Sequence, residues 1–129
     1  MAPLVKGPTE GDILKFDLDK NYTREVVTLK SGTNYALGSV LGEVTADGEY
    51  TLSPDAVVVG LEGAETAAAV LIEAVDATLA DQQGVVISRG PAIVAQDELV
   101  FHASVNDAPK RAAKRAELVA LGIIPRVNA

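Results

Sequence analysis

The stretch GTNYALGSVLGEVTADGEYTLSPDA, from Gly32 to Ala56, decides the fold. Its apolar residues come in short runs, Val40-Leu41 and Tyr50 to Leu52, which turn-forming residues separate. Ala46-Asp47-Gly48 lies between these runs, and Asp and Gly tolerate the positive φ angles of a tight hairpin turn. The stretch therefore predicts a β-hairpin with flanking turns, and it contains no histidine or cysteine that could form a nucleophile–base pair.

Upstream of this hairpin, Leu14, Phe16 and Leu18 alternate with charged residues such as Lys15 and Asp17. A period of two predicts a short strand with one apolar face. The residues before it are rich in proline and glycine and show no periodicity, which predicts an extended arm. Two placements stay open for this strand, because it could be the first strand of the domain's own sheet or could add to a sheet edge of a partner.

Downstream of the arm, short apolar runs predict several more strands. Glu25, Val27 and Leu29 form one alternating run. Residues 67–75 are apolar on both faces apart from Glu73, which predicts a buried strand, and the alanines leave a short helix as the alternative. Residues 76–84 are expected to form a loop. The remaining expected strands cover residues 85–87, 92–94 and 99–103.

The C-terminal part carries the signals of one helix. Asn106 and Asp107 are capping residues, a proline follows in the first turn, and Gly122 is a suitable stop. An alanine face is expected to pack on the sheet. Basic residues occupy the opposite face: Lys110, Arg111, Lys114 and Arg115. These four cations could be solvated, could dock an acidic partner or could contact a neighbouring subunit.

These patterns predict a β-rich α+β fold, a small single domain of short strands and hairpins with one C-terminal helix and an extended N-terminal arm. Residues 1–23 are interpreted as the arm, and residues 24–129 as the β-rich domain. No repeat or linker divides the chain further.

Composition excludes several classes of function. The net charge of −7 argues against nucleic acid as a partner, because phosphate binding needs a basic surface. The absence of cysteine removes disulfides, thiolate metal sites and thiol nucleophiles. The N-terminus lacks the apolar core of a signal peptide and no apolar run is long enough to span a membrane, so we expect synthesis in a cytoplasm and no membrane partner. A mean hydropathy of +0.21 predicts that another chain covers part of the surface.

The residues that could carry out catalysis are few. His102 is the single histidine, and its alternation with Phe101 favours a structural strand residue over a general base. One histidine without cysteine does not make a zinc site, and the acidic residues lack the order of a calcium loop. We therefore expect no enzyme activity, no metal and no cofactor. Two other classes of function stay open: a hydrolase with dispersed carboxylates, and a carbohydrate-binding module that stacks sugars on Tyr22, Tyr35 or Tyr50.

Four blocks of the sequence, taken in order, resemble one known family. They are REVVTLKSGTNYALGSVLGEVTADGEYTLSPDA, AAAVLIEAVDAT, GVVISRGPAIVAQDELVF and LVALGIIPR. Their succession and spacing, from Arg24 to Arg126, resemble the head decoration proteins of lambda-like tailed phages, the protein D family.

The resemblance implies a structural late protein of the virion. Proteins of this family form homotrimers on the outside of the expanded head, bind the major capsid protein and stabilise the shell against internal DNA pressure. It further implies that the arm docks on the capsid. By position, this role falls on Leu14, Lys15, Phe16, Asp17 and Leu18.

Overall fold

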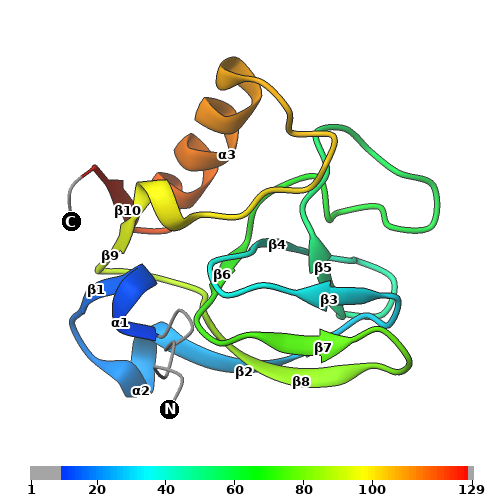
Figure 1. Cartoon of the computed structure of the whole chain (residues 1–129), viewed down its shortest axis with the longest axis horizontal. Coiled ribbons are helices and arrows are strands. Elements are labelled where there is room, and N and C mark those ends of the chain that lie inside the picture. The colour runs from blue at the N-terminus through cyan, green and yellow to red at the C-terminus, as the bar shows by residue number, and fades with distance from the viewer. Residues whose placement is uncertain (1–9, 128–129) are drawn as a thin grey trace, which may run out of the picture.

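The computed structural model describes residues 10–127 and shows one β-rich domain with a single long helix near its C-terminus (Figure 1). The strands of this part of the chain are β1 (Leu14–Asp17), β2 (Arg24–Leu29), β3 (Thr33–Tyr35), β4 (Val40–Glu43), β5 (Tyr50–Leu52), β6 (Ala69–Leu71), β7 (Val75–Ala77), β8 (Gln82–Ile87), β9 (Ala92–Ala95) and β10 (Ile123–Arg126). The helices are α1 (Glu10–Ile13), α2 (Lys20–Thr23), the short 3₁₀ helix η1 (Gln96–Glu98) and α3 (Ala108–Ala120). The predicted fold class is confirmed, and the first nine residues of the predicted arm lie outside the described residues.

Residues 10–127 form three sheets, the first of which is a closed barrel with the strand order β2-β5-β4-β6-β8. The hairpin predicted from the opening stretch is confirmed: β4 and β5 pair antiparallel, and Gly48 in the turn has a φ of 72°. Apolar side chains from all five strands fill the barrel, because the strands alternate between inward and outward residues. Leu29, Leu41, Leu71 and Val86 are among the fully buried ones.

The second sheet has the order β1-β9-β10, with β9 antiparallel to β1 and parallel to β10. Helices α1 and α3 contribute to a second core on the inner face of this sheet, around Ile13, Val94, Leu118 and Ile123, all of which are fully buried. Since Ile13 belongs to this core, part of the segment predicted as an arm is built into the domain.

Two segments have a different structure from the one expected from the sequence. The loop expected at residues 76–84 contains the end of β7 and the beginning of β8, and β7 pairs with β3 in a two-stranded sheet. Strands of three residues are too short to show a clear alternation. The strand expected at residues 99–103 is also wrong, since only Val100 forms a bridge, to Ser39. A turn then redirects the chain, because the Val105 N–H donates to the carbonyl of His102.

Helix α3 begins and ends where its capping residues predict. The carboxylate of Asp107 accepts from the Lys110 N–H, and Gly122 has a φ of 84°. The predicted packing face is wrong, because the alanines at 108, 112 and 116 are exposed and Leu118 and Lys114 are buried.

The burial of Lys114 has a physical reason in the acceptors around its ammonium group. It donates to Ser53 Oγ at 2.9 Å and to the Glu65 carbonyl, and Glu117 lies 3.6 Å away. Its aliphatic stem packs in the interior while these oxygens replace water. This cation therefore ties α3 to the segment between β5 and β6.

Candidate docking surface

Strand β1 lies at an edge of its sheet. Its inner edge pairs with β9, and the Leu18 N–H extends this pairing by donating to the Pro91 carbonyl at 3.1 Å. No strand of residues 10–127 pairs with its outer edge. Of the two placements left open by the sequence, the structure therefore shows β1 in the chain's own sheet. The outer edge still offers backbone groups to which a further strand could pair.

A register shift between Leu14 and Phe16 divides the apolar face expected for β1. Leu14 lies opposite the buried Val94 and packs against the inner core. Phe16 instead lies opposite Ile93 on the outer face of the sheet. The strict alternation predicted for this strand is thus wrong at the shift, because an irregularity in pairing turns the following side chains to the other face.

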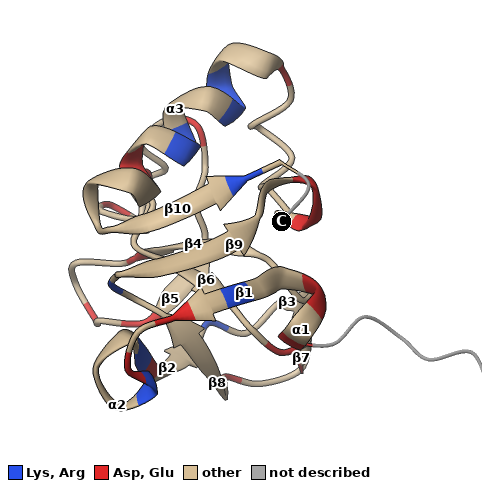
Figure 2. Cartoon of the chain, turned by 90° about the vertical axis from the view of Figure 1, so that its left-hand side faces the viewer, with Lys and Arg blue, Asp and Glu red and all other residues tan. Residues whose placement is uncertain are grey.

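An apolar row crosses the outer face of the sheet. Ile93 is opposite Phe16 on one side and opposite Ile124 of β10 on the other, so the three side chains are neighbours. Phe16 is 47% exposed and Ile124 is 37% exposed. We call these three residues the outer row, and Figure 2 views the sheet that carries it from the outside. Leu18, at 67% exposure, continues the apolar surface past the end of β1.

Charged groups hold β1 against the rest of the domain. Asp17 accepts from Thr23 Oγ1 at 2.9 Å and from Arg24 Nε at 3.1 Å, and Arg24 also pairs with Glu10. Burial raises the pKa of the Asp17 carboxyl, but the bonds from Arg24 and Thr23 outweigh it and leave the pKa below its ordinary value. Lys15 is exposed and donates to the Gly11 carbonyl at 2.8 Å.

Replacing Asp17 with Asn should lower the melting temperature at neutral pH and have less effect in acid. A carboxyl with a depressed folded pKa stabilises the fold above its unfolded pKa, and this contribution is lost as the pH falls through the folded value. We expect a loss of about 1 kcal/mol at pH 7, disappearing between about pH 5 and about pH 2. Thermal unfolding of both proteins across this range tests it, and a difference that persists in strong acid would contradict it.

The other candidate residues do not assemble into a reactive site. His102 Nδ1 accepts from the Ser104 N–H at 3.0 Å, so the ring stabilises a turn. Within residues 10–127, no group of three or more His, Asp or Glu side chains could hold a metal ion. Of the three tyrosines that could stack on a sugar, Tyr35 and Tyr50 are buried and Tyr22 is exposed. No helix in the described part has the length and apolar character needed to cross a membrane.

A protein-family model described as bacteriophage lambda head decoration protein D matches residues 3–123. The chain belongs to the lambda head decoration protein D family. The match spans the barrel, α3 and the β1-β9 pair, so the family resemblance seen in the sequence is confirmed over nearly the whole chain. Membership indicates a decoration role on the phage capsid, and therefore a place in the virion. No curated protein matches the sequence.

The sequence did not indicate that Ile93 and Ile124 belong to the outer row of this decoration protein. Ile93 lies in a run of apolar residues that predicts a strand but does not tell which face is exposed. Ile124 follows the glycine that ends α3 and stands directly before Pro125, a residue type that is uncommon inside strands. The pair Ile123-Ile124 after that glycine was the available signal, because two β-branched residues favour an extended backbone.

Proposed function

We propose that this protein binds the exterior of the expanded phage head as a homotrimer and stabilises the shell against the pressure of the packaged DNA. The observation that carries the proposal is the outer row, an exposed apolar surface beside an open strand edge in a chain of the head decoration family. The partner is the major capsid protein. A segment of it pairs with the outer edge of β1 and covers the outer row.

Different residues of β1 have different tasks in this proposal. Phe16 and Leu18 contact the capsid, because both side chains are exposed. Leu14 and Asp17 hold the strand in place from the inner side, and Lys15 lies on the solvent side. Residues 1–23 act together as the docking segment, although residues 10–23 are also part of the folded domain. Burial of Phe16 alone stabilises the contact by about 1–2 kcal/mol.

Weak single contacts suffice when they are repeated. Three chains in one trimer bind three equivalent sites, so that the second and third contacts form at a high effective concentration. The trimer thereby bridges neighbouring capsid subunits, and separating them requires breaking several contacts together. No reaction is needed for this role.

Co-sedimentation of the purified protein with undecorated heads tests the proposal. Expanded and unexpanded heads are compared in parallel, with bovine serum albumin as the control for trapping. We expect saturable binding to the expanded heads and none to the unexpanded ones. Absence of binding to both forms would refute the proposal, and equal binding to both would refute the dependence on expansion.

A further inference from the structure

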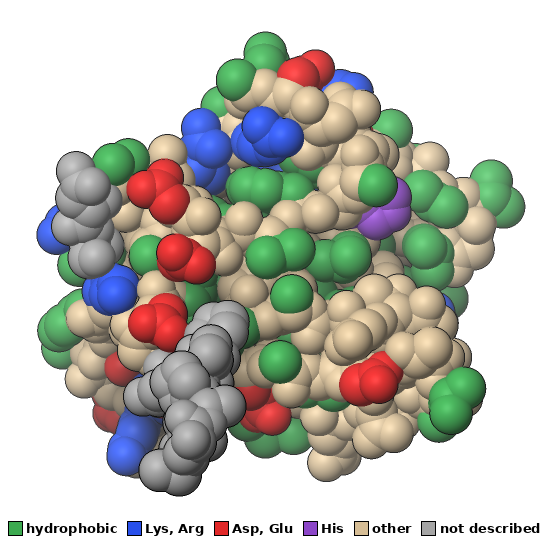
Figure 3. Space-filling view, in the orientation of Figure 1, with side chains coloured by type: hydrophobic (Ala, Val, Ile, Leu, Met, Phe, Trp, Pro, Cys, Tyr) green, Lys and Arg blue, Asp and Glu red, His purple; other side chains and the backbone are tan. Residues whose placement is uncertain are grey.

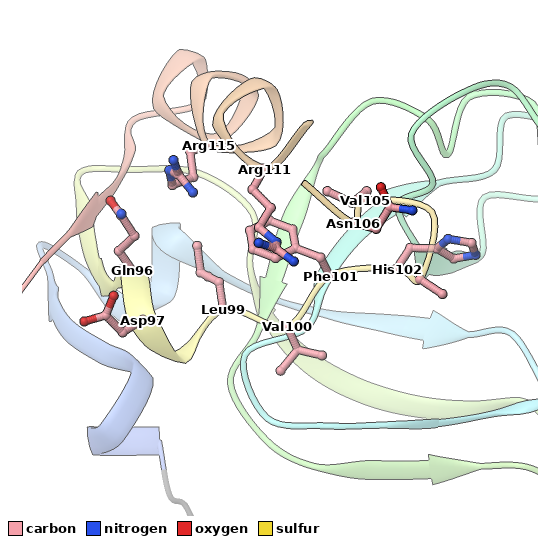
Figure 4. Close-up of a pocket in the computed structure, with 11 residues that line it drawn as sticks. Gln96, Asp97, Leu99, Val100, Phe101, His102, Val105, Asn106, Arg111 and Arg115 are labelled. Atoms are coloured by element: carbon pink, nitrogen blue, oxygen red, sulfur yellow. The ribbon is translucent and has the colours of Figure 1, made fainter. Parts of the chain in front are cut away.

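A pocket of about 610 Å³ lies between α3 and the segment that follows η1. Leu99, Phe101 and Val105 give it an apolar floor, and Arg111 and Arg115 of α3 form one wall. Figure 4 shows both arginine side chains pointing from the helix toward this floor. Figure 3 shows the same face of the molecule, with basic side chains of α3 above hydrophobic ones.

The two arginines lack ionic partners within residues 10–127. The other cations of the same helix have partners. Lys114 Nζ donates to Ser53 Oγ in the interior, and Lys110 Nζ lies 3.8 Å from a carboxylate oxygen of Asp55. Asp97 also lines the pocket, next to Gln96, but forms no ion pair with either arginine. In a chain of net charge −7, two unpaired guanidinium groups beside an apolar floor fit an acidic and apolar segment.

This chain itself carries a segment of that chemistry. The loop of residues 54–63, which we call the valine loop, projects from the domain beyond β5 (Figure 1). Val57 and Val59 on it are exposed, and Val59 is exposed at 95%. Glu62 follows them, and its exposed carboxylate accepts only a backbone bond from the Gly60 N–H at 2.9 Å.

The valine loop has a defined conformation. The Leu61 N–H donates to the Val58 carbonyl, and the Ala64 N–H donates to the Leu61 carbonyl. Its base is fixed where the Asp55 N–H donates to Ser104 Oγ at 2.9 Å. Exposed valines on a loop held by these bonds lose little conformational entropy on binding, so they suit an interface.

We propose that the valine loop of one copy inserts into the arginine pocket of the next copy, and that this contact builds the trimer. Val57 and Val59 cover the apolar floor, and the carboxylate of Glu62 pairs with Arg111 and Arg115. This inference rests on the trimer of the proposed function and names the surfaces that form it. The contact is head-to-tail, since it joins two different surfaces of the same chain.

The positions of the two surfaces fit a closed ring. In a cyclic trimer each copy fills a sector of about 120°, and its two contact surfaces meet near the axis. Loop and pocket are neighbours on one copy, because Ser104 fixes the loop base and His102 and Ala103 line the pocket. The segment 102–104 therefore lies closest to the three-fold axis.

Analytical ultracentrifugation of the full chain and its variants tests the interface. Val59→Glu places a charge on the apolar floor and should weaken association by about 100-fold. The double variant R111E/R115E should weaken it similarly, by repelling Glu62. Leu79→Glu is the matched control: Leu79 is 97% exposed on the loop between β7 and β8, and its replacement should leave the trimer intact.

Mixing the two defective proteins examines whether the surfaces face each other. The Val59→Glu chain keeps a normal pocket and the R111E/R115E chain keeps a normal loop, so one sound contact can form between them. We expect 1:1 heterodimers by native mass spectrometry and no closed trimer. Failure to form heterodimers would overturn the proposed pairing, as would a wild-type chain that stays monomeric at millimolar concentration.

Head binding of the same proteins separates this inference from the proposed function. Wild-type chains that bind heads while both variants remain trimers would overturn the interface and leave the decoration role standing. Wild-type chains that trimerise through these surfaces and bind no heads would support the interface and refute the role. A Val59→Glu protein that stays trimeric but loses head binding would assign the valine loop to the capsid and overturn its assignment to a second copy.

Discussion

Replacing Phe16 with Asp is expected to abolish binding to expanded heads. The carboxylate would lie in the middle of the contact between the outer row and the capsid, where it has no partner and loses its water. A loss of about 2–3 kcal/mol at one site corresponds to about 30- to 150-fold in affinity, and three linked sites multiply it. Co-sedimentation at increasing protein concentration measures the effect.

The matched control is Val26→Asp, which introduces the same charge at an exposed valine of β2, outside the sheet β1-β9-β10. It should bind heads as the wild type does. Both variants should remain folded, because both parent side chains lie on the surface, at 47% exposure for Phe16 and 61% for Val26. Saturation of heads by Phe16→Asp at wild-type concentrations would exclude the outer row as the docking surface.

Replacing Gly90 with Ala should cause a large loss of stability. A Cβ at this position would stand 1.9 Å from the carbonyl oxygen of Gly122 and 2.7 Å from its Cα. Both are backbone atoms and cannot rotate away, so β9 and the turn before β10 must separate. This separation breaks the bond from the Gly90 N–H to the Leu121 carbonyl at 2.8 Å. We expect a loss of about 4 kcal/mol and a fall in melting temperature of about 10–20 °C.

Gly11→Ala provides the control for this substitution. A Cβ at Gly11 would meet no atom within 4 Å beyond its chain neighbours and the backbone of its own helix, α1. Alanine should therefore be neutral there or stabilise by up to about 1 kcal/mol. Differential scanning calorimetry compares the two proteins, and equal melting temperatures would contradict the close approach of the two backbones.

Turn glycines, helix-capping residues and apolar runs in the sequence predicted the elements in which they occur. The turn at Gly48, the cap at Asp107 and the stop at Gly122 each require a particular residue type, and the hairpin and α3 are where these residues place them. The apolar run around Val86 likewise predicted a buried strand. Short apolar runs between turns, followed by one capped helix, were therefore enough to predict the β-rich α+β fold class.

Long-range contacts account for what the sequence did not reveal. The burial of Lys114 depends on oxygens of Ser53 and Glu65, about half the chain away, which no helical projection includes. The outer row depends on the order β1-β9-β10 and on a register shift, and neither leaves a pattern within a single strand. The docking role of residues 14–18 stays a prediction from their alternation and position, whereas Ile93 and Ile124, the neighbours of Phe16 in the outer row, were not predicted at all.

The loop between β7 and β8 suggests how the protein could carry foreign sequence. Exposed loop tips tolerate insertions best, and Leu79 at this tip is almost fully exposed. Figure 1 places the loop on the side of the domain opposite β1 and β10. A peptide inserted after Leu79 would therefore face away from the sheet β1-β9-β10, whereas one fused next to β1 would lie beside the proposed capsid contact. A head decorated with such a fusion could then carry the inserted peptide on every copy of the protein, while the outer row stays free to bind the capsid.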